Sequence, residues 1–138
     1  MVVSCDFWWT IYHEFFHIFD PEVKDKKWKR INRRNFVYTG NVFHEARRSG
    51  KKRKSSKLEF TEVDYKSDFV SSYAMSEERE DRAETFADMM TEGKNFLRRI
   101  EKNSVIKKKM EYIIELTDKR KLMGREFWQK HLGLPEEK

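Results

Sequence analysis

The chain has 138 residues, of which 38% are hydrophobic and 39% charged, a length and composition typical of one soluble domain. This length excludes a TIM barrel or a two-domain enzyme, which need roughly 200 residues or more. No window approaches the ~20 consecutive apolar residues of a membrane helix, so we expect no membrane span.

The net charge of +6 is unevenly distributed along the chain. Residues 21–60 carry 14 basic and 4 acidic side chains, whereas residues 61–90 carry 3 basic and 9 acidic ones. Residues 1–20 carry three acidic side chains and no Lys or Arg. This pattern predicts a cationic loop beside an acidic centre, and it argues against a uniformly basic nucleic-acid binder.

Cys5 is the single cysteine, so the chain can form neither an internal disulfide nor a cysteine-based zinc cluster. The residues before the first helix contain no basic segment followed by an apolar run, so we do not expect them to form a signal peptide. The compartment therefore stays open, and we expect a monomer.

Apolar spacing predicts a first helix over residues 6–19, which Pro21 ends. Four apolar residues share one face of this helix: Phe7, Ile11, Phe15 and Ile18. From Pro21 to about Asp68 the pattern loosens into a long basic loop. Within it, the runs 35–38 and 58–63 predict either a small hairpin or segments that lie flat on the core.

Helical periodicity returns after Ser76, the predicted N-cap of a second helix that continues toward Phe96 or Leu97. Its predicted buried face consists of Ala83, Phe86, Ala87 and Met90. A third helix is expected over about 104–122, and a short closing helix follows Gly124. These elements predict a mainly helical single domain over the whole chain.

His13-Glu14-Phe15-Phe16-His17 is an H-E-x-x-H motif on the first predicted helix. Four residues advance a helix by about 400°, so His13 and His17 point the same way, as two ligands of one Zn²⁺ require. Glu14 lies about 100° around the helix, where it can take a proton from a zinc-bound water. The alternative is a pair of surface histidines, since short motifs also occur by chance.

Two histidines need a third protein ligand. A metzincin pattern is excluded, because Asp20 and Val23 stand where it needs Gly and His. The remaining source is the second helix, on which Glu80 and Glu84 lie one turn apart. Asp20 lies on the same helix face as both histidines, so we expect its carboxylate to accept a hydrogen bond from a ligand histidine and orient it. Direct zinc ligation by Asp20 is the alternative.

Residues 72–87 read Ser-Tyr-Ala-Met-Ser-Glu-Glu-Arg-Glu-Asp-Arg-Ala-Glu-Thr-Phe-Ala. With the His-Glu-Phe-Phe-His motif, this stretch resembles the gluzincin zinc peptidases. The resemblance is to a family of small zinc-binding metallopeptidases and to the catalytic domain of anthrax lethal factor. Residues 28–38 also resemble the family, with Arg33 where the family has proline.

The resemblance implies that Glu80 is the third zinc ligand, that Glu84 orients a ligand histidine, and that Tyr73 stabilises the transition state. It also implies a zinc-dependent metallopeptidase that hydrolyses peptide bonds in a peptide or protein, through a zinc-activated water with Glu14 as general base. Relatives in this family are often exported.

Zincin peptidases of this type place a small sheet before the motif helix, whereas only about six residues precede it here. We therefore expect a zincin-like α+β remnant that lacks the N-terminal sheet of the family. In it, the H-E-x-x-H helix packs on the glutamate-bearing helix, and turnover is weak. The alternative is a substrate cleft built from residues 21–68.

Three other functions stay open. The first is a zinc-binding interaction module without catalysis. The second is binding of nucleic acid or an acidic partner through the basic residues at 47–57, although no aromatic side chain is interleaved for base stacking, so we expect a solvated loop. The third is a repressor-cleaving protease, which shares both motifs, although the Ser72-Tyr-Ala element favours the lethal-factor-like group. The pair His44-Glu45 is no zinc motif, because Arg48 replaces the second histidine.

Overall fold

The computed structural model describes residues 5–20, 25–40 and 65–136. They form the helices α1 (Cys5–Phe19), α2 (Lys26–Ile31), α5 (Glu78–Glu92), α6 (Lys94–Ile100), α7 (Ser104–Lys119) and α8 (Arg125–Leu132), with the 3₁₀ turns η1 (Lys66–Asp68) and η2 (Tyr73–Met75). These ranges contain no strand, which confirms the mainly helical class. The expected basic loop at 47–57 and the apolar run 58–63 lie outside the described residues.

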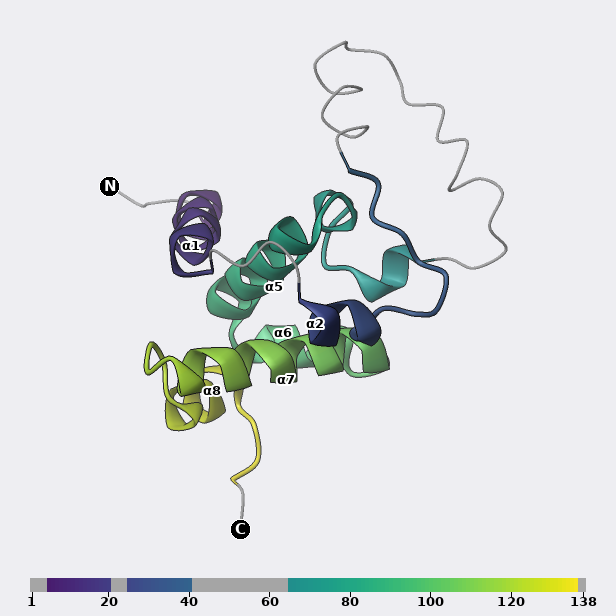
Figure 1. The fold of residues 1–138 in the computed structure, drawn as a ribbon. Coiled ribbons are helices and arrows are strands. Elements are labelled where there is room, and N and C mark those ends of the chain that lie inside the picture. The colour runs from purple at the N-terminus through teal and green to yellow at the C-terminus, as the bar shows by residue number, and fades with distance from the viewer. Residues whose placement is uncertain (1–4, 21–24, 41–64, 137–138) are drawn as a thin grey trace.

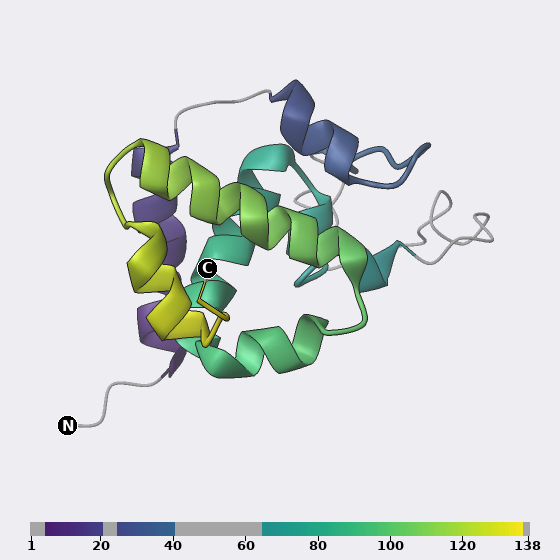
Figure 2. The same cartoon turned by 90° about the horizontal axis from the view of Figure 1, so that it is seen from below.

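The helix α5 is central: it packs against α1 on one side and against α7 on the other (Figure 1). Viewed from below, α6, α7 and α8 form a layer in front of α5 (Figure 2). The core between these elements includes the fully buried Phe16, Phe86, Ile113 and Trp128. Within the described ranges, no helix has the length and apolar character needed to cross a bilayer.

The helix α1 meets the core mainly through Phe16, and the partly buried Tyr12 and Phe19 pack beside it. The Phe16 ring is fully buried against Phe86, with 4.9 Å between the ring centroids. The four apolar residues predicted to form the buried face of this helix are instead 38–83% exposed, although the Phe15 ring still lies 6.3 Å from that of Phe86 between centroids. Periodicity therefore indicates correctly which residues lie together, but it does not indicate which face turns inward.

The helix α2 lies where the sequence predicts only a loose basic loop. The Asp25 side chain caps it by accepting hydrogen bonds from the backbone N–H groups of Lys27 and Trp28. The Trp28 ring is fully buried and makes an edge contact with Tyr112 of α7, at 5.0 Å between ring centroids. The run 35–38 forms no strand and lies on a second apolar cluster, which consists of Tyr65, Phe69, Ala74 and Met75.

The boundaries of α5 differ from the prediction at both ends. Ser76 is not its N-cap, because the Ser76 hydroxyl donates to the Tyr73 carbonyl at 2.6 Å and closes η2, and the helix starts at Glu78. Gly93 ends it with a φ of 54°, so the expected continuation is a separate helix, α6. Gly124 separates α7 from α8, as expected.

Candidate metal centre

The three predicted zinc ligands come together where α1 and α5 pack antiparallel to each other. The Nε2 atom of His13 lies 3.0 Å from Glu80 Oε2, and that of His17 lies 3.1 Å from the same oxygen. The two Nε2 atoms are 3.0 Å apart. Among the described residues these three side chains form a group that could hold a metal ion.

The spacing of these donor atoms fits a zinc ion. Bonds of 2.0–2.2 Å in a tetrahedral site place the donors roughly 3.3 Å apart. The observed separations of 3.0–3.1 Å need only a small outward shift to reach that value. Two imidazoles and one carboxylate also match the ligand set of catalytic zinc sites that keep a fourth position open.

Glu84 lies behind His13, on the side away from the other donors. Its Oε2 accepts a hydrogen bond from His13 Nδ1 at 2.8 Å, which leaves Nε2 for the metal. Its Oε1 accepts a hydrogen bond at 2.8 Å from the hydroxyl of Ser71, a residue that sequence reasoning missed. The geometry thus gives Glu84 the position that an orienting carboxylate requires.

A second missed contact lies one helical turn away, between Trp9 and Asp88. The Trp9 indole N–H donates to Asp88 Oδ1 at 2.5 Å, and the indole stacks on the His13 ring with 5.2 Å between centroids. Trp9 lies four residues before His13 on α1, and Asp88 lies four residues after Glu84 on α5, so the same helical spacing also brings this pair together. The sequence spacing therefore contained a signal for this contact.

Asp20 does not take the predicted position. Its Oδ2 pairs with Nε of the fully buried Arg82 at 2.5 Å, and Arg82 also reaches Glu78 at 3.5 Å. A buried guanidinium needs a carboxylate partner, and Arg82 lies on α5 beside the end of α1. Asp20 thus fixes the end of α1 on α5, and it is not part of the group of three donors.

Glu14 and Tyr73, the two predicted catalytic residues, differ in their surroundings. Glu14 is exposed on α1. The ring of Tyr73, on η2, lies 6.3 Å from the His13 ring between centroids. Burial and the neighbouring Glu80 carboxylate raise the pKa of Tyr73 to about 12, so its phenol keeps its proton at neutral pH.

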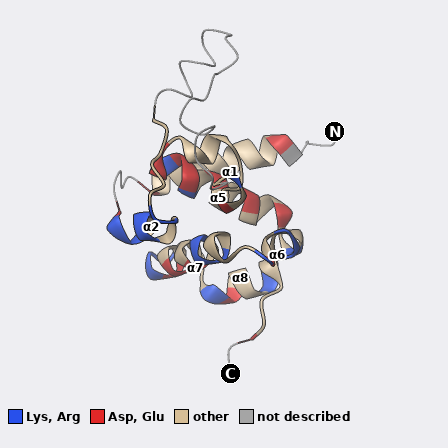
Figure 3. Ribbon diagram, turned by 90° about the vertical axis from the view of Figure 1, so that its right-hand side faces the viewer, with Lys and Arg blue, Asp and Glu red and all other residues tan. Residues whose placement is uncertain are grey.

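The carboxylates of α5 also change the protonation of the ligands. Burial lowers the pKa of His13, but the hydrogen bonds to Glu80 and Glu84 outweigh burial and raise it to about 9. Burial raises the pKa of Glu80, but its two histidine partners lower it to about 2. These carboxylates belong to an acidic stretch of α5 beneath α1, whereas basic residues gather on α2, α6 and α7 (Figure 3).

Asp81, next to Glu80 in sequence, anchors the start of α5 in the core. Its Oδ2 accepts hydrogen bonds from Tyr38 at 2.7 Å and from Trp28 at 3.2 Å, and it pairs with Lys109 at 2.9 Å. Burial raises the pKa of Asp81 and lowers the pKa of Lys109, while each charge opposes the shift of the other. This network joins α2 and α7 to the turn that carries Glu80.

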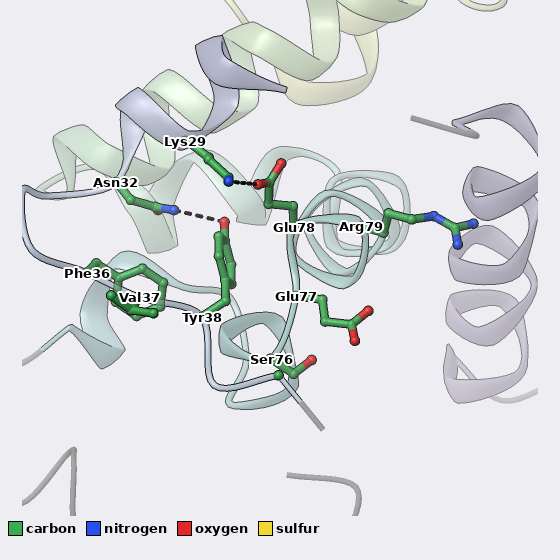
Figure 4. Close-up of a pocket in the computed structure, with 10 residues that line it drawn as sticks. Lys29, Asn32, Phe36, Val37, Tyr38, Ser76, Glu77, Glu78 and Arg79 are labelled. Atoms are coloured by element: carbon green, nitrogen blue, oxygen red, sulfur yellow. Dashed lines mark hydrogen bonds and ion pairs between the residues drawn. The ribbon is translucent and has the colours of Figure 1, made fainter. Parts of the chain in front are cut away.

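A hollow of about 520 Å³ lies between α2, residues 36–40 and the first turn of α5 (Figure 4). Lys29 pairs there with Glu78 at 3.2 Å. The side chain of Arg79 points away from it toward α1, where it donates to the His17 carbonyl at 3.4 Å. The residues that line the hollow include none of the three donors.

Residues 4–131 match the model of a family described as "Putative zinc-binding metallo-peptidase". No curated protein and no solved structure matches the chain. The family match covers both the H-E-x-x-H motif and the glutamate-bearing helix.

Proposed function

We propose that this chain, which belongs to the family of zinc-binding metallopeptidases, is a zinc-dependent peptidase of the gluzincin type, similar to the catalytic domain of anthrax lethal factor. Its reaction is the hydrolysis of peptide bonds in a peptide or protein. One observation carries the proposal: His13, His17 and Glu80 converge from two helices that are far apart in the sequence.

In this proposal His13, His17 and Glu80 hold the ion. Zinc supplies Lewis acidity: it lowers the pKa of a water toward ~7 and stabilises negative charge on a carbonyl oxygen. To become a ligand, His13 gives up the proton that its raised pKa retains. Glu84 keeps the Nδ1–H of that ring in place, so that Nε2 remains the metal-binding nitrogen.

Glu14 is the general base of the proposed mechanism. It takes a proton from the attacking water and later delivers it to the leaving amine. Its exposure on α1 leaves the carboxylate accessible to a substrate. Tyr73 donates a hydrogen bond to the carbonyl oxygen as negative charge develops there, and its raised pKa keeps the required proton in place.

Zinc content and cleavage of an unstructured protein such as casein, measured on the same samples, test this proposal. We expect Glu14→Gln to retain one zinc per chain and to lose turnover, because glutamine cannot accept the proton. We expect Glu80→Ala to lose zinc, whereas Glu77→Ala, an exposed glutamate three residues earlier, retains it. Full turnover in Glu14→Gln removes Glu14 from the mechanism.

Unchanged stoichiometric zinc in Glu80→Ala contradicts the ligand assignment. Wild-type protein that binds zinc but cleaves no unstructured protein favours the alternative of a zinc-binding interaction module.

A further inference from the structure

Ser71 lies at a junction between the metal centre and the turn that carries Tyr73. Its Oγ lies 2.8 Å from Glu84 Oε1 and 3.1 Å from the backbone nitrogen of Ala74. The Ala74 N–H can only donate, so it occupies a lone pair of the Ser71 hydroxyl. The single hydroxyl proton is thereby directed at Glu84.

Glu84 is consequently held through both of its oxygens. Oε1 accepts from Ser71, and Oε2 accepts from His13 Nδ1, each at 2.8 Å. A carboxylate bound through one oxygen can turn about its own side-chain bonds, whereas two bonds in different directions fix its plane. Glu84 is only 3% exposed, so solvent has little access to replace the serine.

We propose that Ser71 is a positioning residue of the metal centre, an inference that rests on the proposed function. Ser71 orients Glu84, and Glu84 fixes the tautomer and the plane of the His13 ring toward the ion. Through its bond to Ala74, the same hydroxyl ties η2, and with it Tyr73, to this carboxylate. Ser71 thus links the proposed ligand His13, through Glu84, to the turn that carries Tyr73.

Zinc affinity, measured by competition with a chromophoric chelator, tests this role. We expect Ser71→Ala to bind zinc about tenfold more weakly, at the low end of the range for losing an outer partner of a metal ligand. Ser72→Ala is the matched control, because Ser72 is exposed and its side chain does not cap the turn. We expect this variant to bind zinc with wild-type affinity. Ser71→Thr keeps the hydroxyl, so we expect it to bind zinc with wild-type affinity.

A double-mutant cycle with Glu84→Ala shows whether Ser71 acts through Glu84. In the Glu84→Ala background, Ser71→Ala has no carboxylate left to orient and causes no further loss. A tenfold loss that persists in that background overturns the proposal, as does wild-type affinity in Ser71→Ala. If circular dichroism shows that Ser71→Ala does not fold, Ser71→Cys replaces it, because the thiol is similar in size and only a weak donor. We expect the same loss of zinc affinity in Ser71→Cys, and wild-type affinity in it overturns the proposal.

The wild-type titration separates this proposal from the proposed function. Wild-type protein that binds no zinc overturns both. Tight wild-type binding that Ser71→Ala leaves unchanged overturns only the role of Ser71.

Discussion

The zinc affinity of the wild-type protein is expected to rise steeply with pH. In the metal-free chain the pKa of His13 is about 9, against an ordinary value of 6.5, because the Glu80 and Glu84 hydrogen bonds outweigh burial. A proton and a metal compete for the same imidazole nitrogen. At pH 7, two units below this pKa, roughly one molecule in a hundred has the free imidazole that zinc requires.

The magnitude follows from this competition. Well below the pKa, each unit of pH raises the fraction of free His13 about tenfold, so the apparent Kd for zinc tightens about a hundredfold between about pH 6 and 8. Binding also releases about one proton from this residue. Isothermal titration calorimetry in two buffers of different ionisation enthalpy measures both the affinity and the number of protons released.

A variant with one orienting carboxylate removed provides the control. Glu84→Gln takes away one of the two groups that raise the pKa of His13, so its affinity levels off at a lower pH than that of the wild type. An apparent Kd that stays constant from about pH 6 to 8, with no proton released, refutes the reasoning.

Three further predictions concern stability. Lys109→Met leaves Asp81 buried without its cation, so we expect the free energy of unfolding in urea to fall by about 3–5 kcal/mol. The control Lys108→Met changes an exposed neighbour and should leave this free energy unchanged. Equal free energies of unfolding in the two variants contradict the burial argument. Gly93→Ala places a side chain on a residue with a φ of 54°, so we expect it to lower the free energy of unfolding by about 1–3 kcal/mol in the same assay. An unchanged urea midpoint contradicts backbone strain at this position. In the metal-free protein the raised pKa of His13 stabilises the fold below pH 6.5, and this contribution is lost as the pH rises through about 9. The thermal midpoint should fall over that interval, and saturating zinc should remove the fall.

The donor set was predictable because its spacing is a local property of helices. A four-residue step places His13 and His17 on one side of α1, and it relates Glu80 to Glu84 on α5 in the same way. The chemistry of the motif then requires a third ligand, and the resemblance points to Glu80. In the structure these three side chains lie close enough together to hold one metal ion.

Other features depend on partners that spacing cannot identify. Asp20 was expected to orient a ligand histidine, but its carboxylate pairs with Arg82, whose burial is a property of the tertiary fold. The helix α2 has six residues, too few for a periodic pattern, and it depends on the cap of Asp25 and the burial of Trp28. Ser71 lies in an irregular stretch before η2, where no periodicity applies.

The orientation of α1 explains why metal binding and helix packing form one constraint. Apolar residues such as Phe7, Ile11 and Ile18 are exposed on this helix, while polar groups share its inner side with Phe16, unlike in an ordinary amphipathic helix. Buried polar groups are stable only when they are paired, and each of these meets a partner on α5: an indole with an aspartate, the histidines with glutamates, and an aspartate with an arginine. A shift of α1 by one turn would set the histidines against other carboxylates of α5, but it would separate Asp20 from the fully buried Arg82. The pairing therefore fixes the register of α1 on α5, and the same register brings the three donor atoms within reach of one ion.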